Sequence, residues 1–86
     1  MSGRERLLPE ALHGSPEIPA GRWRHFKGGE YRVLGLARHS ETGEEYVVYQ
    51  ALYGEGGIWV RPASMWRETV CRDGVEQPRF VWLGED

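Results

Sequence analysis

Three consecutive polar residues in the middle of the chain have the side-chain types that a nucleophilic hydrolase uses. His39, Ser40 and Glu41 provide a base, a hydroxyl and a carboxylate. A catalytic triad needs these groups to converge in space, which consecutive residues rarely achieve. The same residue types are also typical of a turn in which side chains cap backbone N–H groups. One hypothesis is therefore a hydrolase or nucleotide-processing enzyme that uses His39, Glu41 and His25, and the alternative is a structural turn.

Trp59 and Arg61 stand two residues apart, so on a strand their side chains share one face. A guanidinium binds a carboxylate or phosphate through two hydrogen bonds, and an indole beside it provides a flat apolar surface. We therefore predict a surface that binds a ligand or partner here, flanked by Gln50, Arg32 and Leu52. The alternative is that Trp59 packs beneath the following turn while Arg61 pairs with a surface glutamate.

Residues 22–27 alternate cations with rings in the order Arg-Trp-Arg-His-Phe-Lys. This mixture suits phosphate contacts and base stacking. Weak binding of single-stranded nucleic acid through Arg22, Trp23, Arg24 and Lys27 is therefore a third hypothesis. The alternative is a solvated edge strand that its charges protect from aggregation. The net charge of −2 argues against tight nucleic-acid binding.

No pattern in the chain indicates a metal or a cofactor, and we expect neither. Cys71 is the only cysteine, which excludes an internal disulfide and a paired-cysteine zinc motif. His25 and His39 do not stand at a metal-ligand spacing. The glycine-rich segment 54–57 lacks the Lys-Ser/Thr pair and the helix of a phosphate-binding loop, so it is interpreted as a flexible turn.

The length and composition fit one small domain with a thin core. The chain has 86 residues, of which 40% are hydrophobic and 12% aromatic, and this excludes full disorder. No apolar run approaches the roughly 20 residues of a transmembrane helix, and the N-terminus lacks the apolar centre of a secretory signal. With a single cysteine, these features predict a cytoplasmic protein without a membrane partner.

Proline and glycine interrupt residues 1–21, so we predict a mobile N-terminal extension over 1–21, with a short helix near 7–13, and a domain over 22–86. Within that domain, turn signals separate segments rich in β-branched and aromatic residues, which predicts short antiparallel strands. We expect strands at 23–27, 30–39, 45–53, 58–61, 68–72 and 79–83, a helical turn at 62–66 and a tight Asp-Gly turn at 73–74.

The turn positions set a trial register for the central strands. In this register an uncharged face with the tyrosines forms the core, and a mixed face with Trp59 and Arg61 points outward. A slip of one residue would exchange the two faces. The register pairs Tyr31 with Tyr53, Val33 with Ala51, Gly35 with Tyr49 and Ala37 with Val47, and in the next hairpin it pairs Tyr53 with Ile58 and Ala51 with Val60.

These elements predict an all-β fold, a small SH3-like antiparallel barrel of five or six strands with one helical turn, because closure hides strand edges. The mixed outer face then makes a non-enzymatic binding module our first hypothesis. Its expected partner is an unidentified protein, a peptide or a small anionic ligand. A homodimer through the same outer face is an alternative.

Five segments of the chain form a pattern that is specific when taken together. They are His25-Phe26-Lys27-Gly28, Ala37-Arg38-His39-Ser40-Glu41-Thr42, Val48-Tyr49-Gln50-Ala51-Leu52-Tyr53, Trp59-Val60-Arg61-Pro62 and Met65-Trp66. Over roughly residues 22–83 this pattern resembles the bacterial domain-of-unknown-function family 1653. The resemblance implies a small soluble bacterial protein and assigns no activity. Trp66 stands where the family is expected to have Phe, and residues 1–21 lie outside the pattern.

Overall fold

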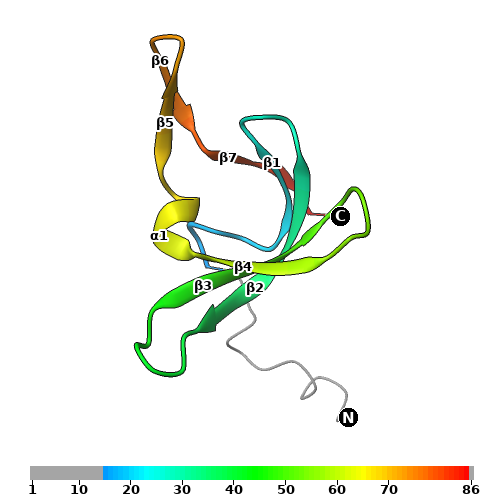
Figure 1. Cartoon of the computed structure of the whole chain (residues 1–86), viewed down its shortest axis with the longest axis vertical. Helices are drawn as coiled ribbons and strands as arrows, with labels where there is room; N and C mark the ends of the chain where they lie inside the picture. The colour runs from blue at the N-terminus through cyan, green and yellow to red at the C-terminus, as the bar shows by residue number, and fades with distance from the viewer. Residues whose placement is uncertain (1–14, 86) are drawn as a thin grey trace.

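The structure is a computed structural model that describes residues 15–85 (Figure 1). The predicted all-β class is confirmed, whereas the short helix expected near residues 7–13 lies outside the described residues. The elements are β1 (Gly21–His25), β2 (Glu30–Arg38), β3 (Glu45–Ala51), β4 (Ile58–Pro62), α1 (Ala63–Trp66), β5 (Thr69–Arg72), β6 (Val75–Pro78) and β7 (Phe80–Gly84).

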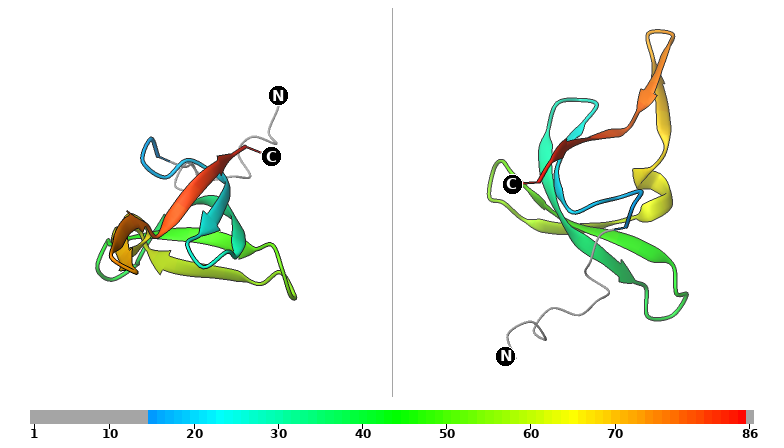
Figure 2. Two further views of the ribbon diagram at one scale, coloured as in Figure 1. Left: turned by 90° about the horizontal axis from the view of Figure 1, so that it is seen from above. Right: turned by 180° about the vertical axis from the view of Figure 1, so that it is seen from behind.

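Five of the strands form one antiparallel sheet in the order β4-β3-β2-β1-β7, while β5 and β6 form a separate hairpin. Figures 1 and 2 show this hairpin projecting away from the sheet. Strands β4 and β7 are the two edges of the sheet, so the backbone of residues 15–85 does not close into the expected barrel.

The β5–β6 hairpin turns at Asp73 and Gly74, as the sequence predicts. Both residues have positive φ, 55° and 78°, as a two-residue hairpin turn requires. Strand β6 itself was not expected, because Val-Glu-Gln-Pro has little β-propensity and no apolar alternation. It forms because the turn places it directly beside β5.

A β-bulge in β2 changes which side chains of this strand face the core. The register shifts between Val33 and Gly35, so Leu34 has no pairing partner. A bulge bends its strand and strengthens the local twist. Gly35 lies at this bulge, and a glycine within a strand is a typical site of such a bend. Beyond the bulge Leu36 lies opposite Val47, in the place where the trial register put Ala37.

The trial register is wrong for both central hairpins. Tyr49 lies opposite Val33 and Tyr31 opposite Ala51, because the bulge and a shorter β3 shift the pairing. In the next hairpin Tyr49 lies opposite Trp59, since the turn begins directly after Ala51 and is wider than expected. That second shift is by an odd number of residues, which exchanges the faces of β4.

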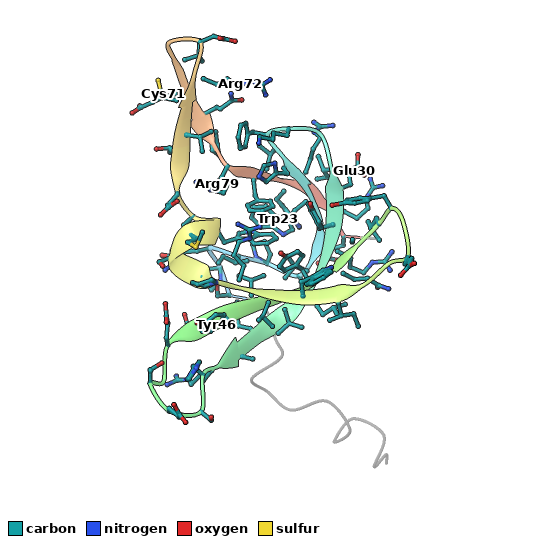
Figure 3. The ribbon with its side chains drawn as sticks, viewed as in Figure 1. Trp23, Glu30, Tyr46, Cys71, Arg72 and Arg79 are labelled. Atoms are coloured by element: carbon teal, nitrogen blue, oxygen red, sulfur yellow. The ribbon has the colours of Figure 1, made fainter. Side chains whose placement is uncertain are left out.

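Trp66 fills the space that the curved sheet encloses. Its indole stacks on Phe80 with the ring centres 3.7 Å apart and the planes within 2°, and it lies 5.0 Å from the ring of Tyr49 and 5.8 Å from that of Trp23. Figure 3 shows Trp23 inside the same space. Ile18, from the segment predicted as an extension, is also fully buried in this core.

Substitution of Trp66 tests this packing. Trp66→Ala is expected to lower the free energy of unfolding by about 3–5 kcal/mol, or to unfold the domain, because it removes the largest core side chain. Trp66→Phe is expected to change it by less than about 1.5 kcal/mol, because the ring remains and a buried Nε1–H that has no acceptor within residues 15–85 disappears. Urea denaturation measures both, and a loss below about 1 kcal/mol for Trp66→Ala would contradict the assignment.

Candidate functional site

Four aromatic side chains line a hollow of about 410 Å³ at one end of the inner face of the sheet. We call this hollow the aromatic cup. Its walls are completed by Ala51 and the glycine-rich turn 54–57. The rings come from β2, β3, β4 and the turn that joins β3 to β4, and they belong to Tyr31, Tyr49, Tyr53 and Trp59.

Trp59 stands at the open edge of the cup and is 60% exposed. The turn beside it is held in place from the opposite face, because the Gln50 side-chain amide donates a hydrogen bond of 3.1 Å to the Gly56 carbonyl. A Cβ at Gly57 would come within 3.1 Å of the Trp59 Nε1 atom. The glycine therefore lets the turn approach the indole closely.

The floor of the cup is rigid. Tyr31 makes edge-to-face contacts with Tyr49 and Tyr53 at 5.2 and 5.6 Å, and a hydrogen bond of 2.7 Å joins the hydroxyls of Tyr31 and Tyr53. Burial, and then the hydrogen bond to Tyr53, raise the pKa of Tyr31 to about 12. This hydroxyl therefore stays protonated at neutral pH.

A cationic group adjoins the cup on the same face. Arg61 lies two residues from Trp59, opposite Val47, and its Cζ atom is 5.8 Å from the ring centre of Phe80. Its Nε atom is buried and has no hydrogen-bond acceptor in the described part of the chain. Because Phe80 belongs to β7 and Arg61 to β4, the two edges of the sheet meet here through their side chains.

His25 also lies against Phe80, with the ring centres 4.9 Å apart and the ring planes at 75°. Its Nδ1 atom accepts a hydrogen bond of 3.1 Å from the Lys27 backbone N–H. Burial lowers the pKa of His25, and the positive charges of Arg61, Arg79 and Lys27 lower it further. The ring is therefore neutral at pH 7, and its hydrogen is on Nε2.

Comparison with known proteins places this fold in a family. The family model described as "Protein of unknown function (DUF1653)" matches residues 21–82. The chain belongs to the DUF1653 family. A crystal structure of a DUF1653 protein from Bordetella bronchiseptica is 42% identical, with a TM-score of 0.75 over 81% of this chain and 92% of that one. A search of curated proteins finds no match.

In this DUF1653 protein the predicted binding residues divide between two faces of the sheet. Trp59 and Arg61 lie together on the inner face, whereas Gln50 and Arg32 lie opposite one another on the outer face. Leu52 is in the turn after β3 and is 37% exposed. The expectation that Gln50 and Arg32 flank Trp59 is therefore wrong, because the shifted register exchanges the two faces of β4 and places Trp59 on the inner face.

One tyrosine was also misplaced by the trial register. Tyr53 was expected in the core together with Tyr49, but it is 55% exposed at the rim of the aromatic cup. Tyr49 is 6% exposed, as expected. The only sequence signal for the cup is the run of tyrosines that the register assigns to one face, and it does not distinguish the floor from the rim.

The cleft that the enzyme hypothesis needs is not formed. His25 adjoins Gly29 and Glu30 at one end of β2, and His39 follows Arg38 at the other end, roughly 30 Å away for a strand of nine residues. Glu30 and Tyr46 mark these two ends in Figure 3.

The His39 loop has the features of a structural turn. The Nδ1 atom of His39 accepts hydrogen bonds from the Glu41 and Thr42 N–H groups at 3.1 and 3.3 Å. This nitrogen is therefore not available as a base while the turn is formed. The hydroxyl of Thr42 also accepts a hydrogen bond from the Glu44 N–H, which caps the same turn.

The Trp23 ring that the nucleic-acid hypothesis needs for base stacking is buried. Trp23 is only 7% exposed, and its Nε1–H donates a hydrogen bond of 3.0 Å to the Pro19 carbonyl. Arg22 lies 3.9 Å from a carboxylate oxygen of Glu30, and Arg24 is exposed on the outer face. The Nζ atom of Lys27 lies 5.8 Å from the ring centre of Phe26, which is partly exposed.

Residues 15–85 contain no group of three or more His, Cys, Asp or Glu side chains that is placed to hold a metal ion. Across the same residues, no helix is sufficiently long and apolar to cross a membrane.

The lowered pKa of His25 predicts a pH-dependent stability. As the pH falls below about 6.5, the unfolded chain takes up a proton first, so the free energy of unfolding declines until the pH passes the lowered pKa. In His25→Asn this decline should be smaller, because the amide oxygen accepts the same hydrogen bond but does not titrate. Urea denaturation between about pH 7.5 and pH 5 measures the difference. His39→Asn is the control, and an unchanged pH dependence in His25→Asn would contradict the prediction.

Proposed function

We propose that this DUF1653 protein is a non-catalytic binding module that holds a peptide segment of a partner protein in the aromatic cup. The observation that carries the proposal is the position of Trp59. This indole is 60% exposed, yet it lies on the face of the sheet that otherwise forms the core. A ligand side chain in the cup would cover it.

The residues around Trp59 favour the hypothesis that its exposed side chain contacts a partner rather than only solvent. Ile58 and Val60 on either side of it are 61% and 59% exposed on the opposite face of β4, so this edge strand presents apolar side chains on both faces. Large apolar side chains that stay exposed on an edge strand mark an interaction site. The ring contacts that fix Tyr31 and Tyr49 reduce the entropy lost when a ligand enters the cup.

The edge position of β4 favours a peptide in an extended conformation. In the described part of the chain β4 pairs only with β3, so its outer backbone groups are available to a further strand. A peptide added there would make main-chain hydrogen bonds and place alternate side chains toward the cup. A small anionic ligand in contact with Arg61 remains an alternative occupant of the same face.

A homodimer is the second candidate, and the same exposed edge favours it. Two copies of β4 can pair antiparallel about a two-fold axis, which would bury Ile58 and Val60 of both chains. Light scattering at micromolar concentration distinguishes the two cases, because a monomer excludes the dimer. We also propose that the protein is cytoplasmic and that its curved sheet is related to the SH3-like barrel.

Peptides selected from a random phage-displayed library against the immobilised protein test the proposed function. Trp59→Ala is expected to weaken binding of the selected peptide by at least about tenfold, as at a binding hot spot. Val60→Ala is the matched control, since its side chain is equally exposed but points to the opposite face. Calorimetry measures both affinities. A library with no enriched peptide, or equal affinities for Trp59→Ala and wild type, would contradict the proposal.

A further inference from the structure

The rings of Phe80, His25 and Phe26 form a row beside the aromatic cup, and cationic side chains lie over two of these rings. The ring of His25 lies between those of Phe26 and Phe80, with centre distances of 4.5 and 4.9 Å. Arg61 lies over Phe80, while Lys27 and Arg72 lie over Phe26, each with its charged atom 5.8 Å from the ring centre. These cations come from β4, from the β1–β2 turn and from β5.

The positive charge at this place is only partly balanced within the described residues. Glu68 pairs with Arg79 at 3.0 Å, but no carboxylate of residues 15–85 forms an ion pair with Arg61. The Nε atoms of both arginines are buried without an acceptor. Buried unpaired N–H groups are costly, so an arrangement that contains two of them favours a bound acceptor.

His25 adds a neutral donor to these charges. Because its Nδ1 atom accepts the Lys27 N–H, the hydrogen of the ring is on Nε2, where it can be donated. The positive charges of Arg61, Arg79 and Lys27 each act on His25 and lower its pKa. A neutral ring among cations binds an oxyanion as a donor and adds no further repulsion.

We propose that Arg61 and His25 form an oxyanion-binding site beside the aromatic cup, which takes a carboxylate or phosphate group of the ligand. The inference deepens the proposed function, because it names the charged group that accompanies the apolar part of the ligand. Arg61 supplies the charge and the Nε–H donor, His25 supplies the Nε2–H, and Lys27 and Arg79 add attraction at longer range. The site is a local concentration of cations in a chain whose net charge is −2.

The test is the NMR titration of the His25 ring in the full chain, in sodium chloride, sodium phosphate and sodium acetate at equal ionic strength. An oxyanion at the site offsets the field of Arg61 and Lys27, so phosphate or acetate should raise the pKa of His25 relative to chloride. A shift in phosphate alone assigns a phosphate-bearing ligand, and a shift in acetate alone assigns a carboxylate.

Arg61→Gln is expected to abolish this shift, whereas Arg61→Lys should reduce it, because it keeps the charge but lacks the Nε–H donor. Arg67→Gln is the matched control, since it removes one exposed arginine that pairs with Glu17 instead. Equal His25 pKa values in all three salts, or a full shift in Arg61→Gln, would overturn the proposal.

Trp59→Ala separates this inference from the proposed function. The shift of the His25 pKa should persist in Trp59→Ala, because the indole is not part of the oxyanion site. A persistent shift without an enriched peptide would contradict the peptide-binding function and support the oxyanion site. An enriched peptide without any shift of the His25 pKa would support the peptide-binding function and contradict the oxyanion site.

Discussion

The stacked pair of Trp66 and Phe80 determines the shape of this protein. The sheet is not closed by backbone hydrogen bonds, because β4 and β7 are both edges. Side-chain contacts from the helical turn therefore bring the two ends of the sheet together. A helix of four residues has no independent stability, so α1 depends on the burial of Trp66 as much as the core does.

The aromatic cup is an extension of that core. The ring of Trp66 contacts Tyr49, Tyr49 contacts Tyr31, and Tyr31 contacts the exposed Tyr53. One continuous set of ring contacts thus runs from fully buried to solvent-exposed side chains. These contacts hold the rings of the cup in place, as the proposed binding function requires.

The curvature of the sheet also creates the electrostatic character of the site. Arg61 and His25 come from β4 and β1, with β3 and β2 between them in the sheet. Both reach the ring of Phe80 because the sheet curls. A flat sheet with the same strand order would keep these groups apart, and an acidic chain would then have no cationic site on this face.

The sequence alone determined the features that depend on a few neighbouring residues. Asp73 and Gly74 specify a tight turn through their tolerance of positive φ, Pro62 starts the helical turn, and alternating apolar residues mark the strands. The pairing of Trp59 with Arg61 on one face follows from the same alternation. The family was also evident from the sequence.

The register, and hence the faces, were decided only by the tertiary structure. The bulge at Leu34 and the width of the turn after Ala51 each shift the pairing, and an odd shift exchanges the two faces of a strand. Gly35 marks a site of curvature, but the size of each register shift depends on contacts between strands and cannot be derived from neighbouring residues alone. For this reason the sequence predicts that Trp59 and Arg61 share one face but assigns them the wrong neighbours.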